Sequence, residues 1–104
     1  MAWKEKLYER ALRRPVDDGA LEAVRSEYHK RRHEIPVDSE LVLHPSKPEL
    51  MTIKTRWLSL IIQFHQEKMT VDAEFSLAAK MMAPEHNRRL AVQFIDSIAD
   101  DLNL

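Results

Sequence analysis

Glycine is nearly absent from this chain, since Gly19 is the only one in 104 residues. Hairpin turns and bulges often need backbone with positive φ, which glycine adopts most readily. Phosphate-binding loops and dinucleotide-binding motifs need several glycines so that the backbone can approach a phosphate. The scarcity of glycine therefore argues against a sheet-rich domain and excludes both glycine-rich nucleotide-binding motifs.

Cysteine is absent altogether, which excludes disulfides, thiolate metal sites and cysteine nucleophiles. A chain without cysteine fits a reducing compartment. The N-terminal segment is charged from Lys4 onward and lacks the apolar core of a secretory signal. The densest apolar run, residues 57–64, is far shorter than the roughly 20 residues that cross a bilayer. We therefore predict a cytoplasmic protein with no membrane partner.

An excess charge of either sign is also lacking. Sixteen basic and seventeen acidic side chains give a formal net charge of −1. No global field attracts nucleic acid or an anionic membrane, so any electrostatic recognition must be local. With 44% hydrophobic and 32% charged residues, the composition is typical of a globular protein. We predict one domain over residues 1–104.

Prolines and capping signals divide the chain into about five expected helices. A helix should stop before Pro15, and Asp17 can cap the next one. Ser46 and Glu49 have the spacing of a capping box, with Pro48 in the first turn. The expected helices cover residues 2–14, 19–34, 46–68, 70–82 and 84–101.

One segment, residues 36–47, is bracketed by prolines and predicted to be a non-helical loop. Residues 37–43 partly alternate between polar and apolar and are compatible with an extended strand. No partner strand is evident for it, and an isolated strand is not stable. The predicted fold class is therefore all-α, a compact bundle of about five helices with this single loop.

Apolar residues surround the expected third and fourth helices when the sequence is projected at about 100° per residue. The third helix alone would carry an apolar arc of roughly 200°, which is more than one neighbour can bury. A surplus of this kind points to a partner protein, and the commonest partner is a second copy. The predicted partner-binding residues lie on this helix: Lys54, Trp57, Ile61 and His65. The alternative is that Lys54 extends past its neighbours to water and His65 is hydrogen-bonded near the helix end.

Three adjacent cations, Lys30, Arg31 and Arg32, stand between His29 and His33 near the end of the expected second helix. They could contact phosphates together with a basic edge on the first helix. Alternatively, they complement the dipole and the unpaired carbonyls of the helix C-terminus.

His29 and His33 have the i, i+4 spacing that places two imidazoles on one helix face, as a metal site requires. A third ligand would have to come from another segment, and nearby arginines oppose a divalent cation. We predict neither a metal site nor a cofactor. The methionine pair Met81 and Met82 is interpreted as core filler.

No complete catalytic set is present, so we predict a protein that is not an enzyme. The favoured hypothesis is a small interaction or regulatory module, homodimeric, that binds a partner protein through apolar helix surface near the expected third helix and the proline-bracketed loop. The alternative is a nucleic-acid-binding regulator in which Lys30, Arg31 and Arg32 act with Lys6, Arg10 and Arg13.

Overall fold

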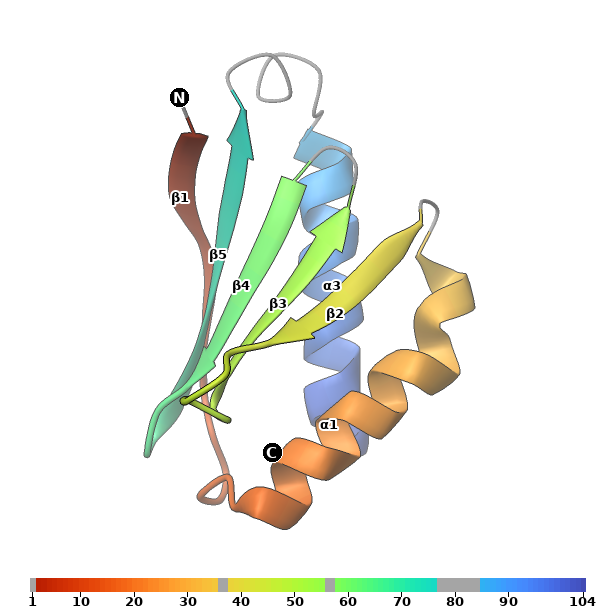
Figure 1. Cartoon of the computed structure of the whole chain (residues 1–104). Coiled ribbons are helices and arrows are strands. Elements are labelled where there is room, and N and C mark those ends of the chain that lie inside the picture. The colour runs from red at the N-terminus through yellow and green to blue at the C-terminus, as the bar shows by residue number, and fades with distance from the viewer. Residues whose placement is uncertain (1, 36–37, 56–57, 77–84) are drawn as a thin grey trace.

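The computed structural model describes residues 2–35, 38–55, 58–76 and 85–104. Within these ranges the chain forms one antiparallel sheet and two α-helices (Figure 1). In chain order the elements are β1 (Ala2–Ala11), α1 (Asp18–Arg31), a short 3-10 helix η1 (Arg32–Glu34), β2 (Ser39–Leu43), β3 (Leu50–Thr55), β4 (Leu58–Phe64), β5 (Lys68–Ser76) and α3 (Glu85–Asp101).

The sheet has five strands in the order β1-β5-β4-β3-β2, and every adjacent pair is antiparallel. The last four strands follow one another as hairpins. The first strand instead pairs with the last one, so that Trp3 lies opposite Phe75 and Ala11 opposite Lys68. The two edges of the sheet are therefore β1 and β2.

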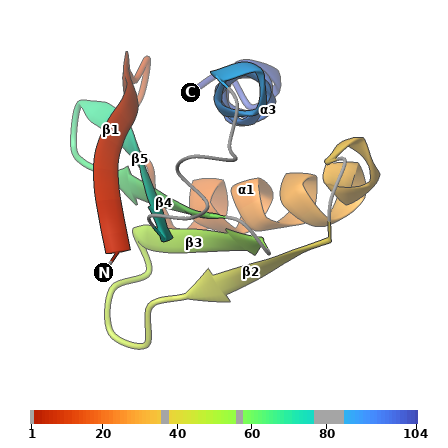
Figure 2. The same ribbon diagram turned by 90° about the horizontal axis from the view of Figure 1, so that it is seen from above.

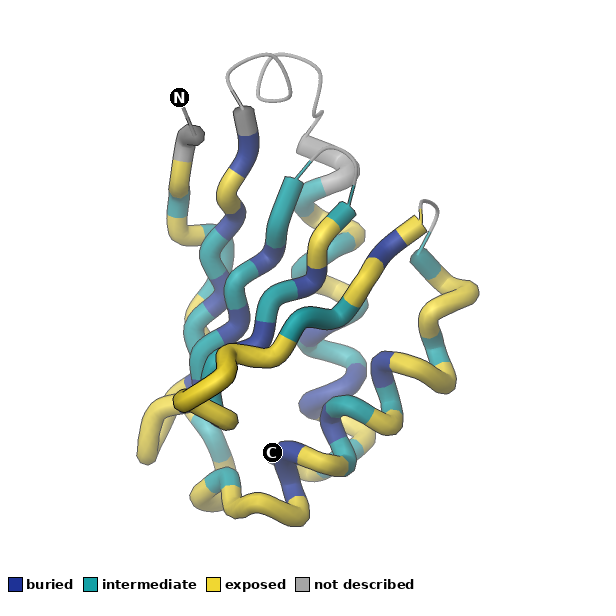
Figure 3. The backbone as a smooth tube through the Cα atoms, viewed as in Figure 1, coloured by how far each residue is buried: buried dark blue, intermediate teal, exposed yellow. Residues whose placement is uncertain are grey.

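Both helices lie on the same side of the curled sheet (Figure 2). Burial alternates along β3, β4 and β5, because every second side chain points at the helices (Figure 3). The buried residues of the sheet and the helices form a single cluster. Its strand members are Met51, Ile53, Leu60, Ile62, Phe64, Met69, Val71, Ala73 and Phe75.

The expected second helix is confirmed as α1. The Asp17 side chain accepts a hydrogen bond from the backbone N–H of Ala20 at 2.7 Å, which satisfies one of the free amides of the first turn. Leu21, Val24 and Tyr28 are buried along one narrow seam, and Ala20 beside it is buried too. The rest of the helix is exposed or partly exposed.

The expected fifth helix is confirmed as α3, which runs to Asp101. Asn103 follows it with a φ of 58°, and the N–H of Leu104 bonds back to the carbonyl of Ala99 at 2.9 Å. This is a Schellman cap, in which a left-handed residue turns the chain and the next side chain packs on the helix. As a result, Leu104 is fully buried.

The prediction of an all-α bundle is wrong. The expected first helix, residues 2–14, is strand β1, and the expected third helix contains β3 and β4. The expected fourth helix overlaps β5, while Met81 and Met82 lie outside the described residues. These segments form a sheet because β-branched and apolar side chains at every second position are buried more completely on one face of a sheet than they would be on a helix.

The proline-bracketed segment is not a loop, because it contains strand β2. Its partner is β3, with Glu40 opposite Lys54 and Val42 opposite Thr52. The residues of β3 were predicted to belong to the third helix, so no partner strand was predicted for this segment.

Turns form here without glycine. Among the described residues only Asn103 has a positive φ, and Gly19 does not. Side chains stabilise the hairpin connections instead. The His44 Nδ1 accepts from the backbone N–H of Ser46 at 3.2 Å and Lys47 at 3.1 Å, and the Thr55 Oγ1 accepts from the N–H of Leu58 at 3.1 Å. Scarce glycine therefore did not exclude a sheet.

The expected surplus of apolar surface is also absent from the described residues. The large hydrophobic side chains among them that are classed as exposed are Leu43, at 40%, and Leu90, at 38%. None of the described helices is long and apolar enough to cross a membrane.

Candidate functional site

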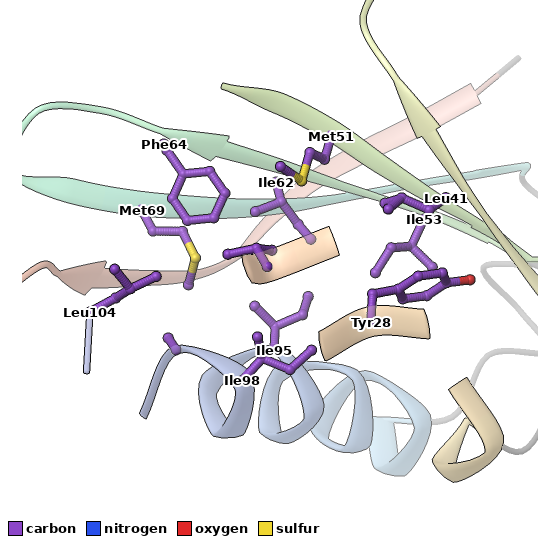
Figure 4. Close-up of a pocket in the computed structure, with 12 residues that line it drawn as sticks. Tyr28, Leu41, Met51, Ile53, Ile62, Phe64, Met69, Ile95, Ile98 and Leu104 are labelled. Atoms are coloured by element: carbon purple, nitrogen blue, oxygen red, sulfur yellow. The ribbon is translucent and has the colours of Figure 1, made fainter. Parts of the chain in front are cut away.

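A small cavity lies between the two helices and the sheet (Figure 4). Its accessible volume is about 20 Å³, which leaves room for about one water molecule. Its lining is apolar: Val24, Tyr28, Leu41, Met51, Ile53, Ile62, Phe64, Met69, Ile95, Ile98, Ala99 and Leu104. The Tyr28 hydroxyl is engaged by the Ser39 Oγ at 2.6 Å. The cavity is a packing gap in the core, too small for a substrate or cofactor.

A polar cluster fixes α3 against β1. Arg10 is the centre of this cluster, and its side chain is only 11% exposed. The guanidinium donates to Asp96 at 2.7 Å and to the backbone oxygen of Leu104 at 2.8 Å, and pairs with Asp100 at 2.8 Å. Tyr8 donates its hydroxyl proton to Asp96. The donors and acceptors satisfy one another, so the cluster holds the helix in place.

The pKa values in this cluster shift as the contacts require. The hydrogen bond from Tyr8, together with Arg10, holds the pKa of Asp96 below its ordinary value despite burial. Burial and the neighbouring Asp96 raise the pKa of the Tyr8 hydroxyl. Burial would lower the pKa of Arg10, but Asp96 and Asp100 outweigh it and raise that pKa.

The Asp96 contacts predict a loss of stability in acid. Because the pKa of Asp96 is lower in the folded chain than its unfolded value of about 3.9, ionised Asp96 adds stability that is complete above that pH. That contribution disappears as the pH falls through the folded-state pKa. Urea unfolding between about pH 6 and pH 2 should therefore show a smaller acid loss for Asp96→Asn than for the wild type. Equal pH slopes would contradict the assignment.

The basic cluster is only partly available to a ligand. Arg31 is engaged by Glu27 at 3.2 Å, by Ser97 at 2.7 Å and by Asp101, so it joins α1 to α3. Lys30 and Arg32 are exposed at the end of α1.

Of the cations predicted on the first helix, Lys6 and Arg10 lie on strand β1 and Arg13 lies in a bend after it. Arg10 belongs to the internal cluster, Lys6 pairs with Glu9 at 3.5 Å, and Arg13 donates to Asn103 at 3.0 Å. These ion pairs and hydrogen bonds engage all three within the chain. They do not combine with Lys30 and Arg32 into one free basic patch.

His29 and His33 are both exposed, on α1 and η1 respectively. His29 packs edge-on against Tyr28, with 5.2 Å between ring centroids. Within the described part of the chain, no three His, Asp or Glu side chains gather as a metal would require.

Two of the predicted partner-binding residues share a surface. Lys54 and Ile61 both lie on the sheet face opposite the helices, since Met51, Ile53, Leu60 and Ile62 point the other way. His65 is in the turn after β4, where its Nε2 lies 3.3 Å from the Thr70 Oγ1. Trp57 lies outside the described residues.

The uncovered sheet face is polar and internally paired. Glu40 lies opposite Lys54, and Lys4 lies opposite Glu74. Cross-strand pairs of opposite charge stabilise a sheet and leave little free charge for a partner. Among the described residues, apolar side chains on this face include Val42, Leu50 and Ile61, all partly buried, and the exposed Ala11 on β1.

The two sheet edges differ in the backbone groups they present. The N–H of Leu12 bonds to the carbonyl of Glu67 at 2.8 Å, and hydrogen-bonded pairs alternate along β1 and β5 from this position. The backbone N–H and C=O groups of β1 that face away from β5 therefore belong mainly to charged residues such as Lys4, Lys6 and Glu9. A register shift between Lys6 and Tyr8 interrupts this edge further. Charges and bulges of this kind prevent another strand from adding.

The edge at β2 has no bulge, and Glu40 is its one charged residue. The N–H of His44 bonds to the carbonyl of Leu50 at 3.2 Å, and hydrogen-bonded pairs alternate along an antiparallel ladder. Glu40 and Val42 therefore bond to β3. The N–H and C=O groups of Leu41 and Leu43 point to the free edge, which we call the β2 edge. Ser39 has the same phase but is only 4% exposed, so its backbone groups are not open to a partner.

The phase of the next pair checks this assignment. The N–H of Phe64 bonds to the carbonyl of Glu49 at 3.0 Å, so Met51 and Ile53 bond to β4 and Thr52 bonds to β2. The predicted binding surface included this proline-bracketed segment, but as a loop, and none of its residues was among the predicted contacts. Its signal was a short apolar strand, Leu41-Val42-Leu43, followed by Pro45.

Comparison with protein-family models, curated proteins and solved structures gives no match to this chain.

Proposed function

We propose that the protein is a small protein–protein interaction module that binds an extended segment of a partner along the β2 edge. Strand addition of this kind draws affinity from main-chain hydrogen bonds and specificity from alternate side chains. The observation that carries the proposal is the contrast between the edges: β1 is charged and bulged, whereas β2 presents Leu41 and Leu43.

Three further features support this surface over the apolar helix surface expected from the sequence. The expected third helix is a pair of strands, so no such helix surface is present. Leu43 is one of the two exposed large hydrophobic residues in the described ranges, and it lies on the β2 edge. Val42 and Leu50 extend the same region onto the uncovered sheet face.

The proposal assigns the protein no catalytic step and no cofactor. We also propose a cytoplasmic location, because a cysteine-free chain suits a reducing compartment.

The test uses a capped peptide of about seven alternating valines and threonines as a generic strand. We expect it to slow amide hydrogen exchange at Leu41 and Leu43 by about tenfold or more, because their N–H groups become bonded. Heteronuclear NMR of the full chain measures each amide. A peptide of the same length with proline at alternate positions lacks the donors and is the control.

A matched pair of variants separates the edge from the fold. Leu43→Pro removes an N–H that points outward, so the chain should fold and lose peptide binding. Val42→Pro removes an N–H that bonds to β3 and should destabilise the sheet itself. Exchange rates that the peptide leaves unchanged at both amides, Leu41 and Leu43, of the wild type would refute strand addition.

A further inference from the structure

We propose that His44 makes strand binding at the β2 edge depend on pH: when its ring gains a second proton, the turn between β2 and β3 opens and the edge binds more weakly. This inference rests on the proposed function, since it concerns regulation of that same edge. His44 directly follows Leu43, the last residue of β2 and one of the two whose backbone groups are open.

The His44 ring closes the turn between β2 and β3, residues 44–49. Its Nδ1 accepts hydrogen bonds from the backbone N–H of Ser46 at 3.2 Å and of Lys47 at 3.1 Å. The Ser46 Oγ lies 3.3 Å from the same nitrogen. Because Nδ1 accepts, the single ring proton of neutral His44 is on Nε2. One nitrogen atom is thus the acceptor for two backbone amides of the turn.

The same turn fixes the end of β2. The N–H of His44 bonds to the carbonyl of Leu50 at 3.2 Å, and the N–H of Leu50 bonds to the carbonyl of Lys47 at 3.1 Å. These bonds connect the residues held by the His44 ring to the first residue of β3. Leu43 lies one position before them, and its outward N–H and C=O must stay in line to bind a strand. An open turn therefore disturbs the exposed part of the β2 edge.

A doubly protonated imidazole cannot accept a hydrogen bond. Histidine gains its second ring proton between about pH 8 and pH 5. Both ring nitrogens then donate, so the Nδ1 proton of His44 would face the amide protons of Ser46 and Lys47. Both residues are exposed, so water can replace the lost acceptor. Acid therefore exchanges the closed turn for an open, hydrated one.

The positions next to His44 across the uncovered face carry no charge. His44 lies opposite Leu50, and the same row continues through Gln63 and Thr70. The charged or titratable groups in the rest of this row and in the two turns at its end are Glu9, Lys47, Glu49, His65, Glu67 and Lys68. Glu9 and Lys68 pair with each other at 3.0 Å. Of this set, His65 is the residue that titrates in the same pH range as His44, so it serves as the control.

The valine–threonine peptide has no titratable group, so its affinity for the full chain at about pH 7.5 and about pH 5 tests the proposal. We expect the wild type to bind it about fivefold more weakly at the lower pH, which is the effect of losing about one hydrogen bond. Heteronuclear NMR measures the dissociation constant. In the same spectra without peptide, the amide-proton signals of Ser46 and Lys47 should move upfield as the His44 ring titrates, because their acceptor is lost.

Two variants at position 44 separate the acceptor from the proton. His44→Asn keeps an acceptor that does not titrate, because an asparagine side chain bonds to the backbone two residues on. It should bind the peptide equally at both pH values. His44→Ala has no acceptor and should bind at both pH values as weakly as the wild type does in acid. His65→Gln removes the other histidine at this end of the sheet and should keep the wild-type pH dependence.

The outcomes distinguish this regulation from strand binding itself. Equal wild-type affinity at the two pH values overturns the regulation and leaves the proposed function standing. A His44→Asn variant that weakens in acid, or a His65→Gln variant that no longer does, overturns the assignment to His44. Absence of binding at either pH overturns the proposed function and its regulation together. Amide signals of Ser46 and Lys47 that stay unchanged while the ring titrates overturn the opening of the turn, whether or not the peptide binds.

Discussion

Replacing Leu104 by alanine is expected to lower the free energy of unfolding by about 3 kcal/mol. Leu104 is 0% exposed and lines the gap between α3 and the sheet, so truncation enlarges an existing cavity. The surroundings are already under-filled there and have little means of collapsing onto the lost atoms. Urea unfolding followed by circular dichroism measures the change.

Leu90→Ala is the matched control, because Leu90 is in α3 but 38% exposed. Its change should stay within about 0.5 kcal/mol. Similar losses for the two variants would show that the Schellman cap does not seat Leu104 in the core.

Replacing Arg10 by methionine is expected to cost about 2 kcal/mol. Methionine keeps the apolar stem that packs beneath α3 but removes the charge shared by Asp96 and Asp100. The backbone oxygen of Leu104 also loses its donor. The cost stays moderate because both carboxylates are partly exposed to water.

Lys6→Met tests whether burial accounts for that difference. Lys6 is on the same strand and pairs with Glu9, but its side chain is 58% exposed. An exposed pair contributes about 0–1 kcal/mol, so this variant should unfold almost as the wild type does. Equal losses for Lys6→Met and Arg10→Met would contradict the role of the buried cluster.

The helices of this fold could be predicted from their caps. Asp17 begins α1, and the apolar spacing of residues 85–101 gives one inward face to α3. Both signals are local, because a cap and a 3.6-residue period depend on a few neighbouring residues.

The strands could not be predicted because their apolar pattern was projected with the 3.6-residue period of a helix and not with the two-residue period of a strand. In β4 the buried side chains are Leu60, Ile62 and Phe64, a period of two. At 100° per residue that pattern spreads around a helical wheel, and the outward Ile61 fills the remaining gap. An apolar arc too wide for any helix is what a strand looks like on that projection. The inferred surplus of apolar surface had the same origin.

The candidate site could be predicted only as a region near the proline-bracketed loop, and its edge strand could not, for a related reason. Alternation over residues 37–43 was visible, but the value of β2 as an edge depends on its place in the sheet order. That order is set by long-range pairing, which one strand's sequence does not encode.

The pairing of β1 with β5 determines when the molecule can fold during its synthesis. The first strand has β5 as its sole neighbour in the sheet, and Arg10 is separated by 94 positions from its contact at Leu104. Contacts between such distant positions form late and slow the search for the native state. While the chain is still being translated, its leading strand therefore has nothing to pair with, and the nascent protein depends on that strand's lysines and glutamates to stay unaggregated.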